Sequence, residues 1–320
     1  MSWTTWNFEP LPLAAAAVAL MLFAGGFLRL RRRAGARYAD GWRVPLFVLA
    51  LALATVPVIS PLDQAGDEYL LSAHMLQHVL LGDAAPALAL VALRGPLLFF
   101  VLPASVLRLL GHRPLLRGAL ALLLRPRVSL ASWALVIGAW HVPAAYDYAL
   151  RHQGVHDLEH LSFLVVGLLV WAQFVEPAPR HRLGPSLRLG CMVAMLAFAL
   201  ALGGLLLAAP PLYPAYAHQS VRLFGIGPAL DQYLAGLVMI GEQVGSLTLC
   251  FAFLLPALRR EVAPAKAHTQ SVWLLQAAPD SLGVHPASNL AFWSGFAHGV
   301  AAFLVEDGAR ALPVGSVDES

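Results

Sequence analysis

Charge is scarce in this sequence, and that shortage decides the class of protein first. Of its 320 residues only 12% are charged, whereas 59% are hydrophobic and the mean hydropathy is +0.69. Soluble domains carry about 25% charged residues, so the composition excludes an ordinary soluble domain and indicates an integral membrane protein. The chain has only two cysteines, Cys191 and Cys250, which excludes a disulfide framework and a CxxC metal pair.

Two further absences narrow the function. The net charge is only +3, and the arginines lie beside apolar segments, so nucleic-acid binding has no support. The N-terminal residues MSWTTWNFEP have no basic n-region, and we expect no cleavable signal peptide. Trp3, Trp6 and Phe8 instead suit the aromatic belt at a membrane interface.

The apolar runs predict an all-α fold, a polytopic membrane helix bundle with seven transmembrane helices. A bilayer core needs roughly 17 to 25 apolar residues per helix. Stretches of this kind lie at residues 11–28, 44–60, 69–92, 128–146, 156–175, 188–209 and 228–257. Residues 95–124 are apolar but are interrupted by prolines, arginines and a histidine. We expect one or two interfacial helices there, with a broken eighth span as the alternative.

The distribution of lysine and arginine predicts the orientation. Of the 21 such residues, all except Arg151 and Arg222 fall in the first connector, in 94–127, in 176–188 or after residue 258. Cytoplasmic loops are enriched in these residues, so the N-terminus is predicted to lie outside and the C-terminus in the cytoplasm.

This reading also predicts the domain organisation. Residues 1–257 form the seven-helix transmembrane domain, and residues 258–320 form a cytoplasmic tail. The tail is moderately apolar at 287–305, where an interfacial helix is favoured over another span. The connector 209–229, rich in Pro, Tyr and Gly, is expected to fold over the outer face, with an ordinary long connector as the alternative.

Five histidines gather at the outer ends of the predicted spans. His74 and His78 are one helical turn apart, as are His156 and His160, so each pair shares a helix face. His141 lies near the outer end of the fourth span. A polar side chain inside lipid costs free energy, so a functional role is its default interpretation. Imidazole nitrogens are suitable ligands for copper, zinc and iron. The sequence predicts a metal site at these five residues, and a cluster of interhelical hydrogen bonds is the alternative.

Three kinds of metal chemistry fit these histidines. The first is transient binding of copper for delivery to another protein. The second is zinc-dependent hydrolysis, because HDLEH at 156–160 matches the inverted zincin pattern with Glu159 as general base. The third is b-type haem, which ranks last because histidines paired one turn apart suit a haem edge poorly.

Further residues are candidates for the surroundings of this site. Met75 is a thioether that suits Cu(I), although it lies about 100° round the helix from His74. Asp83 lies about 180° from His74, near mid-membrane, where it bonds to a neighbouring helix or belongs to an ion path. Asp231 and Glu242 are nearly eclipsed on the seventh span and form either an inner stripe or a polar seam. Carboxylates beside the histidines are expected to fix their tautomers: Asp67, Glu68, Asp157 and Glu159.

Three stretches carry a family resemblance: YLLSAHMLQHVLLGDAAPALALVAL, AWHVPAAYDYALRHQGVHDLEHLSFLVVGLLVW, and PLYPAYA followed by DQYLAGLVM. Together they resemble the seven-span caa3-type cytochrome c oxidase assembly factor family, CtaG, over about residues 60–257. The chain departs from the family pattern after DQYLAGLVM, where it reads IGEQVG instead of a Pro-Gly break. On this resemblance, Asp83 and the five histidines occupy the family's motifs: His74, His78, His141, His156 and His160.

The resemblance implies a multi-pass protein of the bacterial plasma membrane that assists assembly of haem–copper oxidase. Its partners are the lipid bilayer and an oxidase subunit with a copper centre. The leading hypothesis is therefore a non-enzymatic factor that holds copper at the outer histidines and passes it on. The alternative is an intramembrane zinc hydrolase that uses the HxxEH motif, and whether two copies form a homodimer is left open.

Overall fold

The computed structural model describes residues 5–177 and 183–262. Within these ranges the chain is helical and contains no strand, which confirms the predicted all-α class. Contacts divide the chain into two units, Met1–Leu102 with Ala119–Val262, and Pro103–Gly118 with Ala263–Ser320. Trp3 and most of the predicted tail, including 287–305, lie outside the described residues.

Several helices are long and apolar enough to cross a membrane. Five qualify alone: α1 (Pro10–Ala34), the continuous stretch Leu71–Leu93, α11 (Gln153–Val175), α12 (Pro185–Ala208) and α14 (Pro228–Val262). Two bent pairs qualify together: α2 (Arg43–Ile59) with α3 (Pro61–Glu68), and α8 (Pro114–Leu123) with α9 (Pro126–Trp140). The described ranges thus hold five to seven candidate spans. The count of seven and the sides of the two termini stay predictions.

Shorter helices complete the chain. The stretch Leu71–Leu93 is built from α4 (Leu71–Val79), the π-helix η1 (Leu80–Ala84) and α5 (Ala85–Leu93). The region predicted to be interfacial holds α6 (Pro96–Val101), α7 (Ala104–His112) and α8, and its place relative to the membrane stays a prediction. The connectors hold α10 (Pro143–Arg151), α13 (Pro214–Ala217) and the 3-10 turn η2 (Leu223–Gly225).

Proline determines one helix boundary that bears on the candidate site. The fourth span was expected to run over 128–146, but α9 ends at Trp140 and His141 lies at its C-cap. Pro143 is the first residue of α10, and the residue before it, Val142, is extended with φ −67° and ψ 123°. A residue before proline avoids the helical region. The chain therefore turns at Val142, and α9 ends before His141.

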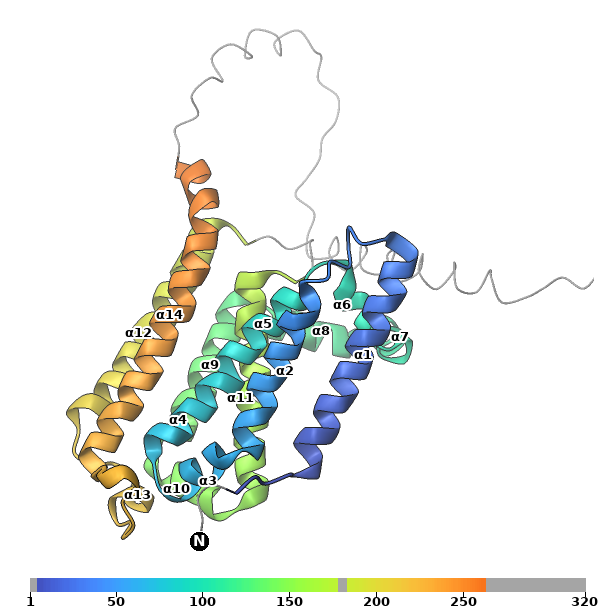
Figure 1. Cartoon of the computed structure of the whole chain (residues 1–320). Coiled ribbons are helices and arrows are strands. Elements are labelled where there is room, and N and C mark those ends of the chain that lie inside the picture. The colour runs from blue at the N-terminus through green and yellow to red at the C-terminus, as the bar shows by residue number, and fades with distance from the viewer. Residues whose placement is uncertain (1–4, 178–182, 263–320) are drawn as a thin grey trace, which may run out of the picture. The chain divides into compact units, whose positions relative to one another are not determined.

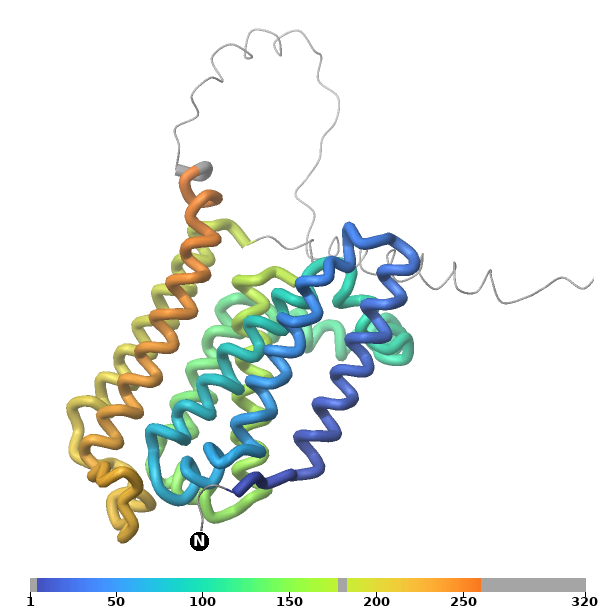
Figure 2. Tube along the Cα trace, viewed as in Figure 1, coloured from blue at the N-terminus to red at the C-terminus, as the bar shows by residue number. Residues whose placement is uncertain are grey.

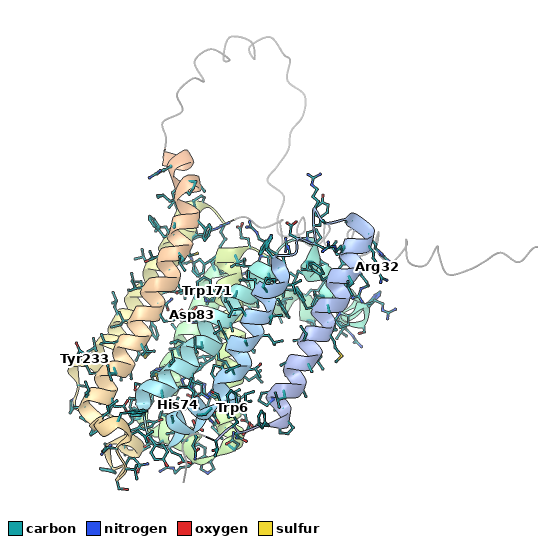
Figure 3. All side chains as sticks on the ribbon, in the orientation of Figure 1. Trp6, Arg32, His74, Asp83, Trp171 and Tyr233 are labelled. Atoms are coloured by element: carbon teal, nitrogen blue, oxygen red, sulfur yellow. The ribbon has the colours of Figure 1, made fainter. Side chains whose placement is uncertain are left out.

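The helices of the first unit pack side by side and give the unit two distinct ends. α2 packs on α5, α11 on α9 and η1, and α14 on both α12 and α4. Helices α3, α10 and α13 lie at one end, and α6 with the C-terminal end of α1 lies at the other (Figure 1, and as a tube in Figure 2). Figure 3 shows His74 near the first end, Arg32 at the second, and Asp83 with Trp171 between them. The histidines and the arginine-rich connector therefore lie at opposite ends of this unit.

Glycine allows α11 to approach η1 closely. A Cβ atom added to Gly167 would lie 1.9 Å from the carbonyl oxygen of Gly82. A Cβ added to Gly82 would in turn lie 3.1 Å from the Cβ of Phe163. Small residues at helix interfaces permit such backbone contact, and here they fix the spacing between the two helical stretches that carry the histidine pairs.

Candidate metal centre

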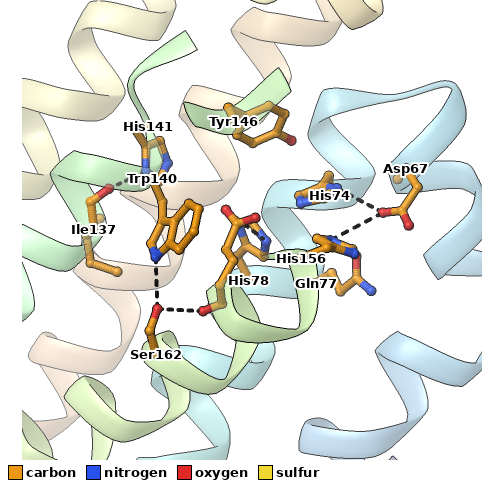
Figure 4. Close-up of polar contacts among 12 residues, drawn as sticks. Asp67, His74, Gln77, His78, Ile137, Trp140, His141, Tyr146, His156 and Ser162 are labelled. Carbon is orange, nitrogen blue, oxygen red and sulfur yellow. Dashed lines mark hydrogen bonds and ion pairs between the residues drawn. The ribbon is translucent and has the colours of Figure 1, made fainter. Parts of the chain in front are cut away.

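Four of the five predicted histidines come together between α4 and α11. Each can offer one ring nitrogen such that the four nitrogens lie within 4.8 Å of one another. The ring centroids are 4.2 Å apart within each helix pair and 5.2 Å apart between His74 and His156 and between His78 and His160. We call this group, shown in part in Figure 4, the four-histidine cluster: His74, His78, His156 and His160.

The ring nitrogens of the cluster are buried and short of partners. His74, His78 and His156 are 0%, 6% and 3% exposed. Within the described ranges, buried nitrogens without a hydrogen-bond partner include Nε2 of His74, Nε2 of His160 and both nitrogens of His78. Burying unpaired polar atoms is costly, and a metal ion would satisfy several of them at once.

The donor set fits a metal that prefers imidazole. Nitrogens on a tetrahedral ion with bonds of about 2.0–2.1 Å lie roughly 3.4 Å apart, so separations of up to 4.8 Å must close by up to roughly 1.4 Å when all four nitrogens bind one ion. All-imidazole sites suit copper and zinc.

Asp67 from α3 is placed to orient two of the imidazoles. Its Oδ1 atom lies 3.2 Å from Nδ1 of His74 and 3.6 Å from Nε2 of His156 (dashed lines in Figure 4). A carboxylate at this distance favours the tautomer with the proton on Nδ1 of His74, which leaves Nε2 as the lone-pair nitrogen, as in carboxylate–histidine–metal arrangements. Gly66 brings α3 this close, since a Cβ there would lie 3.0 Å from the His74 Cα.

Asp231 influences the cluster indirectly, through the start of α4. It lies on α14, is 3% exposed, and accepts hydrogen bonds from the amides of Leu71 and Ser72 at 2.7 and 3.0 Å. The Ser72 hydroxyl donates to it as well, at 2.6 Å. The first amides of a helix have no partner within the helix, and the N-cap residue of α4, Leu70, makes no side-chain cap. Asp231 therefore caps the helix that carries His74 and His78 and contributes no atom to the four-histidine cluster.

The remaining predicted residues surround the cluster. Glu159 is 1% exposed, and its Oε1 lies 3.8 Å from Nε2 of His78. His141 lies outside the group of four and lines an adjacent cavity with Met75, Asp83 and Glu242.

The π-helix explains the position of Asp83. On an ideal α-helix this residue lies on the far side from His74, but η1 inserts a wider turn at Leu80–Ala84. Asp83 consequently lines the same cavity as His78, and its carboxylate accepts a hydrogen bond from the indole nitrogen of Trp171. A π-helical turn is rare and often marks a functional site. The regular helical period does not include such a turn, so periodicity alone could not predict this position of Asp83.

Three buried tyrosines that were not among the predicted site residues lie beside the cluster. The Tyr216 hydroxyl donates to the carbonyl of Gly66 at 2.7 Å, and the Tyr146 hydroxyl lies 3.0 Å from that of Tyr216. The Tyr213 hydroxyl donates to the carbonyl of His141 at 3.0 Å. Burial raises the pKa of Tyr213 and Tyr216 above the ordinary value, so both hydroxyls remain donors. All three lie in stretches that carry the family resemblance, and Tyr213 and Tyr216 also belong to the connector expected to fold over the outer face.

One family model matches most of the chain. The family model described as cytochrome c oxidase caa3 assembly factor matches residues 21–261. Uncharacterised proteins of Mycobacterium bovis and Mycobacterium tuberculosis are each 28% identical to this chain over 249 residues, and one of Mycobacterium leprae is 27% identical. These alignments cover 73% of this chain and 36% of each relative, so the chain spans about a third of their length. No solved structure matches it significantly.

Proposed function

Because the chain belongs to the family of cytochrome c oxidase caa3 assembly factors, we propose that it binds copper at the four-histidine cluster and delivers it to an oxidase subunit. The family itself indicates a non-enzymatic role in oxidase assembly, an oxidase partner and a membrane setting. A metal at this site is supported by one observation: four imidazoles from two helices converge within 4.8 Å. Imidazole also suits zinc, and copper is favoured here by the cytochrome c oxidase assembly family.

The cluster has properties that a site for passing on an ion requires. Its four ligands are neutral imidazoles, which bind copper without the paired thiolates that hold it more tightly. Two carboxylates lie beside these ligands: Asp67 contacts two of the rings, and Glu159 lies 3.8 Å from Nε2 of His78. The short helix α3 and helix α13 of the tyrosine-bearing connector lie at one end of the first unit (Figure 1), which is also the end that holds His74 (Figure 3).

Sidedness and location complete the proposal. The arginine-rich connector lies at the end of the unit opposite His74 (Figure 3), and cytoplasmic loops are enriched in such residues. We therefore place the cluster on the outer side of the bacterial plasma membrane, where an oxidase subunit could accept copper. The family match lends no support to a zinc hydrolase.

The test is copper content in purified full-length protein. Wild type should retain copper, with about one ion held by the four imidazoles, and His78→Ala with His160→Ala should remove that ion by taking one ligand from each helix. His152→Ala is the matched control, because this exposed histidine bonds through Nδ1 to the Tyr148 carbonyl outside the cluster. Unchanged copper content in a folded double variant would overturn the proposal.

A further inference from the structure

A cavity lies directly beside the four-histidine cluster. It has a volume of about 60 Å³, which exceeds the space that one water molecule needs. Its walls come from α4, η1, α9, α11, α12 and α14, and His78 forms part of the wall shared with the cluster. Three other residues of the wall carry metal-binding atoms, an imidazole on His141 and softer thioethers on Met75 and Met239.

The His141 side chain has the tautomer of a metal ligand. Its Nδ1 lies 2.7 Å from the carbonyl oxygen of Ile137. A carbonyl only accepts, so Nδ1 carries the proton and Nε2 keeps its lone pair. The residue is 8% exposed, and Nε2 is buried without a hydrogen-bond partner among the described residues. Histidines that bind metals commonly donate their other nitrogen to a backbone carbonyl in this way.

Two thioethers face the same space. Met75 on α4 is 1% exposed, Met239 on α14 is 9% exposed, and both belong to one packed cluster of side chains. Methionine often fills gaps in a core without further role. Here, however, the space between them is an unfilled cavity, and its wall also includes His141, whose Nε2 has no hydrogen-bond partner among the described residues. Thioether and imidazole together select Cu(I).

We infer that this cavity is a second, softer copper position, in which Cu(I) is bound by Nε2 of His141 and the thioether sulfurs of Met75 and Met239. The inference rests on the proposed function, since the ion would arrive from the four-histidine cluster. His78 borders both places and provides the shared ligand for the move. The ion remains Cu(I) throughout, so no oxidant or reductant is required.

One carboxylate of the cavity wall, that of Asp83, already accepts a hydrogen bond from the indole nitrogen of Trp171. Oxygen ligands also suit Cu(I) poorly compared with sulfur. The sulfur atoms are therefore the distinguishing mark of this position, because the four-histidine cluster offers nitrogen alone.

X-ray absorption of the full-length protein tests the inference, with Cu(I) as the probe and Ag(I) as a second soft ion. Wild type should show sulfur next to the metal, and the signal should be lost in Met75→Leu with Met239→Leu while nitrogen scattering remains. Leucine replaces methionine at nearly constant volume, so the variant should fold. Met195→Leu is the control, since Met195 is fully buried in a separate core cluster.

Each result has a distinct meaning. Copper bound by nitrogen alone in wild type would overturn the second position and leave the proposed function standing. Absence of bound metal in wild type would overturn the proposed function itself. A sulfur signal that survives in the double variant would show that other atoms bind the ion and would also overturn the inference.

Discussion

Replacing Asp231 with alanine should loosen the start of α4 and thereby weaken copper binding. The carboxylate accepts three hydrogen bonds, from the amides of Leu71 and Ser72 and from the Ser72 hydroxyl. His74 lies in the first turn of the helix that these bonds hold. Fraying of that turn would move the His74 ring away from its partners on α11, whereas His78, one turn later, would move less.

The size of the effect follows from these contacts. A hydrogen bond to a charged group contributes about 1.5–3 kcal/mol, and the three bonds share one acceptor and are not additive. We expect a loss on the order of 3–6 kcal/mol in the free energy of unfolding for Asp231→Ala. Asp231→Asn keeps one accepting oxygen and should lose roughly half as much.

The loss of stability is measured by thermal unfolding in detergent, and the weaker copper binding by copper retention in the same samples. Asp231→Ala should melt well below wild type and release copper to a chelator more readily, with Asp231→Asn between the two. Asp40→Ala, in the connector before α2, is a control at the opposite end of the unit. If Asp231→Ala melts with wild type, the carboxylate does not cap α4 and the reasoning fails.

Two further predictions follow from close contacts and from ionisation. Gly167→Ala should lower the melting temperature strongly and reduce copper binding, because the added Cβ would lie 1.9 Å from the Gly82 carbonyl oxygen; Gly204→Ala, with open space around it, should melt like wild type. Burial raises the pKa of Tyr213 and Tyr216, so their contribution to stability is complete below pH about 10 and is lost as the pH rises further. Melting temperatures measured against pH should fall in that alkaline range, and a Tyr216→Phe variant with the same alkaline fall as wild type would contradict the assignment.

The sequence predicts the parts of the site that depend on local periodicity. The spacing of His74 and His78, and of His156 and His160, already places each pair on one helix face. The apolar runs around them predict two long helices, and the structure has both. What periodicity leaves undecided is whether two such faces meet, since that depends on packing between distant segments.

The remaining features arise from contacts far apart in the chain. Asp231 caps a helix that begins 160 residues earlier, and no pattern around either residue indicates the pairing. The wider turn at Leu80–Ala84 moves Asp83 to the face of His78, against the rotation expected for a regular helix. Pro143 was visible in the sequence, yet its effect, an early end to α9 that leaves His141 beside its own cavity, needed the neighbouring helices to be known.

The division of the four imidazoles into two per helix has a mechanical consequence. An ion held by both pairs is a clamp between segments that start 82 residues apart, at Leu71 and Gln153. Binding to the folded state alone raises its stability in proportion to the logarithm of ligand concentration. On the proposed function, a loaded molecule would therefore be stiffer than an empty one at the end that holds the ion, and an acceptor that removes the ion would also release the clamp.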